Sequence, residues 1–341
     1  MTMKKLAAVF WISASLFFSP AGTMATGEQK RGVIKGGVAH AAPDWFKESF
    51  LDIREDVDEA TEANRHVLLF FQLNGCPYCD RMLREAFETD PLMGYIQQHF
   101  DVIAINVRGD REIAFNEDTS VSEKELSELL KVRSTPGIMF LNADNKPVVR
   151  VDGYRAPERF KHILHYVSSK AYQQQTLSSY LNEHLNEPVY SLRDDPMFRD
   201  TTDLSSVQGP LAIIFEDSRC HDCDEFHDRL LADPAVRKEL QRFTMVRLDA
   251  DITTDIIDPA GNKTSPKAWA EQLGMTYRPG VVLYVDGKLL RRYDSLLFGH
   301  HFKEGLRWVG SGAYKREDYQ SYSARRTEEL LDAGIDIDLG K

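Results

Sequence analysis

The 341-residue sequence predicts an α/β protein made of two tandem copies of one fold, each a central mixed sheet flanked by helices. The first copy is marked by VLLFFQLNGCPYC at residues 67–79, where an uninterrupted apolar run leads to a Cys-x-x-Cys pair. Such a run is typical of a strand buried on both faces. The second copy is marked by LAIIFEDSRCHDC at residues 211–223, which repeats the run and the pair 144 positions later. Repetition at a fixed offset indicates that one fold occurs twice.

Residues 1–25 are expected to be a secretory signal peptide. Lys4 and Lys5 precede the apolar residues 6–18, and small residues then lead to a cleavage position after Ala25. The apolar segment has thirteen residues, fewer than the roughly twenty that cross a bilayer as a helix. We therefore expect export to the periplasm, with an inner-membrane anchor facing the periplasm as the alternative.

Charge and cysteine content narrow the function classes. The formal charge is −11, and it becomes −13 without the two lysines of the signal peptide, with acids and bases interspersed along the chain. Nucleic acid is therefore not expected as a partner. All four cysteines lie in the two Cys-x-x-Cys pairs, which leaves none for long-range structural disulfides. We expect reactive cysteines and no metal or other cofactor, only redox-active disulfides.

Domain one is expected at residues 44–186, after a flexible Gly- and Ala-rich link at residues 26–43. Asp44 is expected to cap a helix that runs to about Asn64, because apolar residues recur there at helical spacing. The central strand then follows at residues 67–71.

Cys76 is expected at a strand-to-helix junction. Apolar residues at helical spacing begin at Met82, and Pro77 falls in the first turn, where its missing N–H costs nothing. The free N–H groups and the positive end of this helix favour a Cys76 thiolate, and Cys79, one turn on, can close a ring with it. This pattern indicates redox chemistry.

The remaining elements of domain one follow from periodicity and turn residues. In order, we expect a helix at 92–100, a buried strand at 102–107, a polar loop at 108–122 and a short helix at 123–131. Two strands at 138–141 and 148–151 and a long amphipathic helix at 157–185 follow.

Domain two is expected at residues 187–314, with the boundary inside the Asp-, Ser- and Pro-rich stretch 187–209. A charged tail at residues 315–341 includes a predicted helix at residues 325–333 that Gly334 stops. Four signals of domain one recur here in the same order at offsets of 142 to 143: Asp90-Pro91 as Asp233-Pro234, Phe100 as Phe243, Pro136-Gly137 as Pro279-Gly280, and Ala171-Tyr172 as Ala313-Tyr314.

A strand, a Cys-x-x-Cys, a helix, a strand, a helix and then proline-led antiparallel strands resemble the thioredoxin superfamily, and the resemblance covers nearly all of residues 44–314. Cys-Pro-Tyr-Cys is the motif familiar from glutaredoxins. The signal sequence, long loops and tandem copies look more like periplasmic thioredoxin-related proteins of the SoxW type.

The resemblance implies roles for particular residues. The first cysteine of each pair would attack, the second would resolve, and a cis-proline would lie against the sulfurs; the matching positions are Cys76, Cys79 and Pro136, then Cys220, Cys223 and Pro279. Pro77, Tyr78 and His221 would support the pairs from inside the motifs, and Thr135 and Arg278, ahead of the prolines, would face the client.

Two positions in each copy depart from the superfamily pattern. Gly75 and Arg219 replace the Trp that commonly precedes the first cysteine. Phe70 and Ile214 stand where ordinary thioredoxins carry a buried Asp that assists proton transfer.

Other readings of the motifs remain open. A Cys-x-x-Cys can be half of a zinc site, although 140 residues lie between the two pairs, against a usual spacer of about 15–20. Each pair could also be a purely structural disulfide, although so short a loop gains little chain entropy. The two prolines could be ordinary trans residues, and His221 could be a neutral bystander.

The local charges predict that the two dithiols differ. Arg219, His221 and Arg278 should surround Cys220, and cations near a thiolate lower its pKa and make the disulfide a stronger oxidant. Electrons would then run from domain one to domain two. The carboxylates of Asp217 and Asp222 oppose this effect if they point at the sulfur.

The function expected from these residues is a periplasmic thiol:disulfide oxidoreductase, acting as a reductase. Its partners would be client protein thiols or disulfides and a membrane or periplasmic thiol that donates electrons. The alternative is a binding module, either a client-binding chaperone or a dithiol metal carrier, in which the sulfurs do not turn over.

Overall fold

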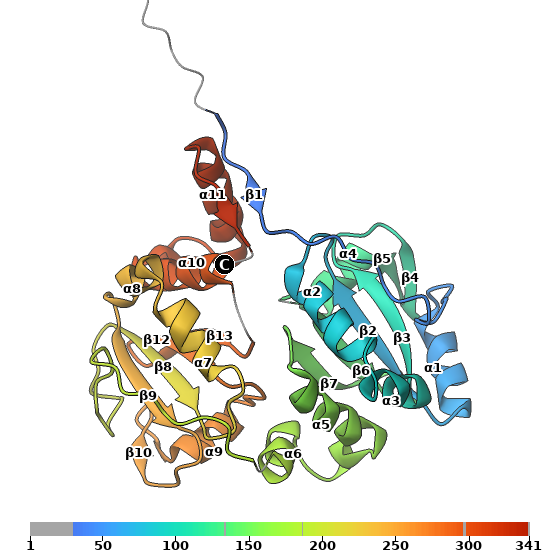
Figure 1. Cartoon of the computed structure of the whole chain (residues 1–341), viewed down its shortest axis with the longest axis horizontal. Coiled ribbons are helices and arrows are strands. Elements are labelled where there is room, and N and C mark those ends of the chain that lie inside the picture. Colours follow the sequence, from blue (N-terminus) through green and yellow to red (C-terminus); the bar gives the residue numbers. More distant parts are fainter. Residues whose placement is uncertain (1–29, 133, 186, 296–297, 340–341) are drawn as a thin grey trace, which may run out of the picture.

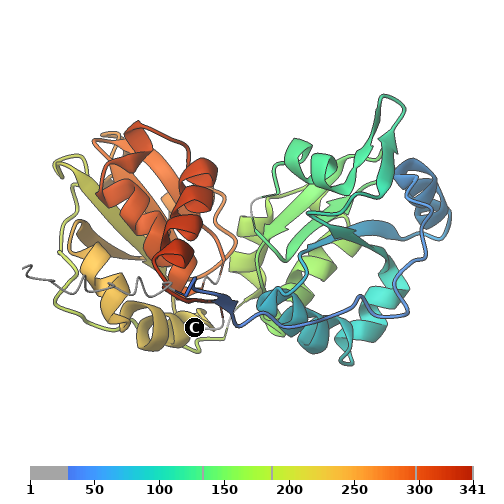
Figure 2. The same cartoon turned by 90° about the horizontal axis from the view of Figure 1, so that it is seen from above.

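The computed structural model describes residues 30–132, 134–185, 187–295 and 298–339. Within these ranges the chain forms two α/β domains that lie side by side, as Figures 1 and 2 show. The predicted signal peptide at residues 1–25 lies outside the described residues. No helix in these ranges has both the length and the apolar character needed to cross a membrane. The predicted tandem of α/β domains is confirmed.

Domain one contains a four-stranded mixed sheet. In spatial order its strands are β3 (Phe100–Asn106), β2 (His66–Gln72), β6 (Gly137–Leu141) and β7 (Pro147–Asp152). β2 runs parallel to β3 and antiparallel to β6, and β7 runs antiparallel to β6. The apolar run ahead of the first cysteine pair is therefore an inner strand.

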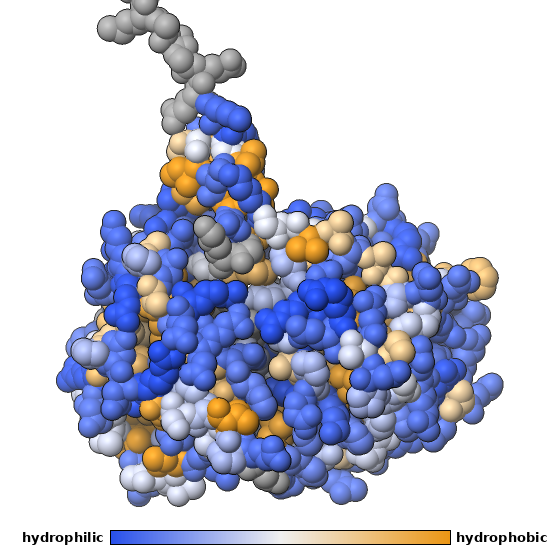
Figure 3. Space-filling model, viewed as in Figure 1, coloured by the Kyte–Doolittle hydropathy of each residue, from blue (hydrophilic) through white to orange (hydrophobic). Residues whose placement is uncertain are grey.

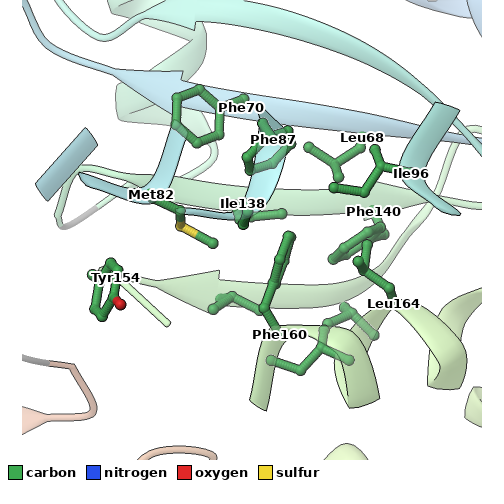
Figure 4. Close-up of a cluster of buried hydrophobic side chains, with 14 of the residues drawn as sticks. Leu68, Phe70, Met82, Phe87, Ile96, Ile138, Phe140, Tyr154, Phe160 and Leu164 are labelled. Atoms are coloured by element: carbon green, nitrogen blue, oxygen red, sulfur yellow. The ribbon is translucent and has the colours of Figure 1, made fainter. Parts of the chain in front are cut away.

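Both faces of β2 are buried, which explains why its sequence is apolar without alternation. Leu68 and Phe70 belong to a cluster on one face, in which Phe87 and Phe160 also lie (Figure 4). The alternate residues of β2 belong to a cluster on the other face: Val67, Leu69 and Phe71. The first cluster includes residues of α2 (Pro77–Met82), the π-helical turn η1 (Leu83–Phe87), α3 (Leu92–His99), α5 (Pro157–Ser168) and α6 (Leu177–His184), and the second includes residues of α1 (Ile53–Glu62) and α4 (Glu123–Leu129).

Domain two repeats this sheet. In spatial order its strands are β13 (Lys288–Tyr293), β12 (Gly280–Val285), β8 (Pro210–Glu216) and β9 (Thr244–Asp249), with the same parallel and antiparallel pairings. Its helices are α7 (Cys223–Glu225), the π-helical turn η3 (Phe226–Leu231), α8 (Pro234–Leu240), α9 (Pro266–Gln272) and α10 (Gly299–Gly310). Alternate residues of β8 again divide between two buried clusters.

The first helix starts later than predicted. It begins at Ile53 rather than after Asp44, because Asp52 is the N-cap and accepts hydrogen bonds from the backbone N–H groups of Arg54 and Glu55. Trp45 lies ahead of the helix, where its indole N–H donates to the carbonyl of Phe87 at 3.1 Å. Trp45 and Phe46 therefore pack on the core from an irregular segment, whereas Phe50 is fully exposed.

The predicted helix at residues 157–185 is divided into three pieces. α5 ends at Ser168, a 3₁₀ turn η2 (Ala171–Gln173) follows, and α6 starts after its cap Thr176. Lys170 has a left-handed φ of 59°, a conformation that ends an α-helix. The hydrophobic spacing continued across this break, so periodicity alone did not reveal it.

The predicted loop 108–122 contains strands. It holds a hairpin of β4 (Glu112–Asn116) and β5 (Thr119–Ser122), and the corresponding insertion in domain two holds β10 (Ile256–Ile257) and β11 (Lys263–Thr264).

The chain ends described by the structure pair with each other. β1 (Ile34–Lys35) lies parallel to β14 (Ile337–Asp338). The link at residues 26–43, expected to be flexible, is therefore tied at this point to the tail that follows domain two. This pairing places residues that precede domain one beside residues that follow domain two. Figure 1 shows the paired segments above the two domains.

The tail helix α11 (Tyr319–Asp332) is longer than predicted. Asp318 caps it by accepting hydrogen bonds from the N–H groups of Gln320 and Ser321. Exposed apolar side chains lie beside it at Val33, Ile34 and Ile335, and Figure 3 shows apolar surface on this projecting part of the molecule.

Acid is expected to weaken domain one through His66. This residue begins β2, is buried, and lies with Nε2 3.1 Å from the Tyr172 hydroxyl oxygen. Burial lowers the pKa of His66 from 6.5 to about 4. The folded state thus favours the neutral ring, so this contribution to stability is present above pH 6.5 and is lost as the pH falls towards 4.

The measurement is chemical denaturation of the wild type and of His66→Phe at pH 7 and pH 4. Between these values the wild type should lose up to about 3 kcal/mol more unfolding free energy than the variant. Pro210 occupies the matching position of domain two, so His66→Phe removes the one imidazole at this place in the repeat. Equal losses in the two proteins would contradict the assignment.

Candidate active site

Cys76 lies at the predicted strand-to-helix junction. It follows β2 and is the N-cap of α2, and its sulfur accepts a hydrogen bond from the Cys79 N–H at 3.1 Å. Pro77 occupies the first turn, where the helix needs no N–H donor. Cys76 and Cys79 form a disulfide, with 5.2 Å between their Cα atoms. The first pair is therefore a closed ring at the positive end of a helix.

The second pair forms the same ring with a different helix start. Cys220 and Cys223 form a disulfide, with 5.5 Å between their Cα atoms. Helix α7 begins at Cys223 with Asp222 as its N-cap, later in the motif than α2 begins in domain one. His221 stands where domain one has Pro77, so the fixed φ that favours an early helix start is missing.

All four cysteines are buried. Cys76 is the most exposed at 7%, Cys220 is 2% exposed, and the two resolving positions, Cys79 and Cys223, are at 0%. Most of the surface of each pair is therefore shielded from solvent.

Tyr78, inside the first motif, is a contact between the domains. Its ring stacks on Phe298 of domain two with 4.1 Å between ring centroids, and its hydroxyl accepts a hydrogen bond from Arg229 of domain two at 2.9 Å. Burial raises the pKa of Tyr78 to about 12, so the phenol is protonated at neutral pH. The second domain thus holds a residue that the sequence assigns to the first active site.

Two buried arginines of domain one extend this interface. Arg155 donates to the carbonyl of Asp294 at 2.8 Å and lies over the ring of Tyr277, 4.8 Å from its centroid. Arg159 donates to the carbonyl of Thr276 at 2.9 Å. Both contacts hold residues adjacent to the sheet of domain two, so the domains meet through bonded polar groups as well as through stacked rings.

The two predicted cis peptide bonds are present. The Thr135–Pro136 and Arg278–Pro279 peptide bonds are both cis, and a third cis bond, which the sequence analysis did not predict, joins Asp90 and Pro91. Pro136 and Pro279 are buried, and Thr135 is half-buried.

Arg278 does not face a client, contrary to the expectation. Its side chain is 3% exposed, and its Nε lies 2.9 Å from Oδ2 of the buried Asp217. Its guanidinium also donates to the carbonyl of Tyr277 at 3.0 Å. The charge of Arg278 is therefore paired inside domain two. An unpaired guanidinium in the interior would destabilise the fold.

The other predicted cations near Cys220 are also engaged or exposed. Arg219 pairs with Asp217 at 3.5 Å and with Asp251, and it donates to the carbonyl of Asn182 in domain one. His221 is exposed. Two of the three cations on which the predicted order of the two dithiols rested, Arg219 and Arg278, are thus paired with carboxylates.

Asp222, between the second pair of cysteines, is buried. It accepts a hydrogen bond from the Tyr277 hydroxyl at 2.7 Å. Burial raises the pKa of Asp222, while the bond from Tyr277 opposes that rise. The loop that leads into β12 therefore holds Asp222 within domain two.

The sequence analysis missed a buried network beside the second pair. Glu216, the last residue of β8, is fully buried, with Oε1 2.6 Å from His227 Nε2, and it accepts a hydrogen bond from the Tyr190 hydroxyl at 3.1 Å. Tyr190 forms one buried cluster with Cys220 and Cys223. A comparison of the two repeats could have indicated this network. Four residues before the first cysteine, domain one has Gln72, whereas domain two has the carboxylate of Glu216.

The family comparison matches both domains. A model described as a thioredoxin-like domain matches residues 53–168 and again residues 197–308. No protein with a curated description matches the chain significantly.

Similar solved structures include a thioredoxin-fold protein from Helicobacter pylori, 25% identical, covering 35% of this chain and 79% of its own, with a TM-score of 0.32. A thioredoxin from Thermus thermophilus is 24% identical and covers 35% of this chain and 85% of its own, with a TM-score of 0.29. A disulphide isomerase from Xylella fastidiosa Temecula1 is 18% identical and covers 39% and 98%, with a TM-score of 0.26.

The two family matches span well over half of the chain, and each contains one four-stranded sheet, one disulfide-bonded Cys-x-x-Cys pair and a cis-proline directly ahead of an inner strand. The chain belongs to the thioredoxin-like domain family and carries two copies of the domain in tandem.

Proposed function

We propose that this protein is a thiol:disulfide oxidoreductase that exchanges disulfides with client proteins in the periplasm, acting as a reductase. The observation that carries the proposal is the pair of Cys-x-x-Cys rings, each following an inner strand of a thioredoxin-like domain and leading into a helix. Each ring can take up two electrons and two protons to become a dithiol, and no further cofactor is needed for this step.

In the proposed cycle, the Cys76 thiolate attacks one sulfur of a client disulfide, and the other client sulfur leaves and takes a proton. The Cys79 thiol then loses its proton and attacks the mixed disulfide. This step restores the Cys76–Cys79 disulfide and releases the second client thiol. A thiol donor must then reduce the ring for the next cycle.

The N-terminus of α2 supports the first step. Its backbone N–H groups point towards the sulfur, as the 3.1 Å bond from the Cys79 N–H illustrates, and the helix dipole favours negative charge at this position. The signal-like residues 1–25 support a periplasmic location, where a membrane or periplasmic thiol would supply electrons.

The competing function is a binding module, either a client-binding chaperone or a carrier that holds a metal through its dithiols. A soft metal binds thiolates, so each reduced pair could supply two ligands. In either alternative the sulfurs do not pass through a covalent adduct with a client.

Variants that lack one resolving thiol distinguish these functions. Cys79→Ser and Cys223→Ser are expressed singly in cells, and at least one of them should accumulate mixed disulfides with clients, because its attacking cysteine has no partner to release it. Non-reducing electrophoresis should then show adducts that dithiothreitol removes, above the level seen with the matching double-serine variants. Absence of such adducts from both single variants would contradict the enzyme proposal.

A further inference from the structure

In each domain, the chain segment that precedes the domain is bonded to the backbone just ahead of the first cysteine. The Val38 N–H donates to the Gly75 carbonyl at 3.3 Å, in an antiparallel bridge. The N–H groups of Val189 and Tyr190 both donate to the Ser218 carbonyl, at 2.8 Å and 3.0 Å. We call residues 37–40 the N-terminal cover and residues 189–192 the linker cover.

The N-terminal cover is lightly held. Its bond to Gly75 is long, and the Val38 side chain is 38% exposed. The backbones of Gly37 and Gly75 approach so closely that a Cβ on Gly37 would lie 3.3 Å from the Gly75 carbonyl oxygen. Figure 1 shows this stretch leaving β1 and crossing the end of domain one that carries α2.

The linker cover is firmly held. Tyr190 is only 7% exposed, its hydroxyl donates to Glu216, and it belongs to the same buried cluster as the two cysteines of the second pair. Arg193, three residues after Tyr190, donates hydrogen bonds to Asp228 at 2.7 Å and to Asp224 at 3.4 Å. These contacts join the linker to the strand before the second pair and to the helix after it.

We propose that the two pairs have different partners: the Cys76–Cys79 pair accepts an extended protein client whose backbone replaces the N-terminal cover at the Gly75 carbonyl, and the linker cover withholds the Cys220–Cys223 pair from such clients. This inference rests on the proposed function. An antiparallel bridge with Val38 already occupies the first position, so the position fits a polypeptide backbone, and a bound client regains the hydrogen bond that the cover gives up.

The exchange can be followed in single steps without turnover. A protein thiolate attacks Cys76 and forms a mixed disulfide, and the released Cys79 sulfur takes a proton. A second thiol of the same protein then breaks the mixed disulfide. The Cys76–Cys79 ring gains two electrons and two protons, and the two protein thiols lose them as they form a disulfide.

The test treats the oxidised full chain with reduced, unfolded lysozyme as the protein thiol and, separately, with dithiothreitol as a small thiol. Samples are quenched with iodoacetamide, and mass spectrometry of peptides reports each pair by itself. In the wild type, lysozyme thiols should open the Cys76–Cys79 pair at least about tenfold faster than the Cys220–Cys223 pair.

Val38→Pro removes the N–H that holds the N-terminal cover. It should raise the rate at the first pair by about three- to tenfold, the range expected for one lost hydrogen bond, and leave the second pair unchanged. Val38→Ala keeps the N–H and should react like the wild type. Equal rates at the two pairs of the wild type, or no acceleration by Val38→Pro, would overturn the inference.

Tyr190→Ala tests the linker cover. It should raise the rate of the Cys220–Cys223 pair with both thiols by about tenfold or more, whereas Tyr190→Phe keeps the ring in the cluster with the cysteines and should change the rate much less. Chemical denaturation of each variant reports whether domain two is still folded. These reactions are stoichiometric and need no turnover. If the two pairs react at different rates but the chain does not turn over clients, only the proposed function is contradicted. If the chain turns over clients but the two pairs react at equal rates, only this inference is contradicted.

Discussion

Replacing Cys76 by Ser is expected to lower turnover of a disulfide-bonded protein by about a thousandfold or more. The reason is chemical, since a serine hydroxyl at neutral pH neither attacks a disulfide as a thiolate does nor leaves from one. The measurement is insulin reduction by dithiothreitol, followed as the turbidity of the released chains, with the full chain as catalyst.

The matched change, Cys220→Ser, is expected to have a much smaller effect in the same assay. Tyr190 shares a buried cluster with Cys220 and is held at both its backbone and its hydroxyl, whereas the segment bonded ahead of Cys76 is held at Gly75 by one long hydrogen bond. Turnover that falls equally in the two variants would mean that both pairs meet the client, and turnover that survives Cys76→Ser would remove Cys76 from the mechanism.

Replacing Asp217 by Ala is expected to destabilise domain two by about 3–5 kcal/mol. Asp217 is 2% exposed, and its carboxylate pairs with Arg278, which is equally enclosed, and with Arg219. Removing the carboxylate leaves Arg278 charged in the interior without its partner, which costs far more than the bond itself contributes. Chemical denaturation measures the loss.

Two controls separate this effect from a general loss of packing. Asp251 also pairs with Arg219, but its side chain is 37% exposed, so Asp251→Ala should cost no more than about 1 kcal/mol. The double variant Asp217→Leu with Arg278→Met removes both buried charges and should recover much of the loss. Equal losses for Asp217→Ala and Asp251→Ala would show that the buried pair has no special role.

The elements around the cysteines could be predicted because their signals are local. An apolar run of strand length, a cysteine pair and a proline at the first helical turn define the start of the first site, and the repeat of this order defines the second domain. The cis bonds at Pro136 and Pro279 followed from the resemblance and from their similar distance along the chain after each first cysteine.

Other features depend on residues that are distant in the sequence. From the sequence, Arg278 is predicted to be a cation that faces the substrate. In the structure its charge is paired with Asp217, which lies on the other side of the cysteine motif in the sequence. Tyr190 belongs to a linker whose composition suggests only a boundary, yet it packs on the second pair of cysteines.

The ends of the chain give the clearest case. The two-residue strands at Ile34 and Ile337 are too short to carry a periodic signal, and they pair only because the tail of domain two returns to the segment ahead of domain one. The same segment then reaches Gly75, so a link without an evident motif contacts the active site.

Catalytic turnover by the unaltered chain tests the central claim most directly. The purified full chain is incubated with an excess of insulin or glutathione disulfide and a thiol reductant, and disulfides reduced per chain are counted while bound metal is measured in the same sample. The proposed enzyme should reduce many disulfides per chain with no metal bound. One equivalent or fewer per chain, together with stoichiometric metal on the reduced cysteines, would contradict it and identify a carrier.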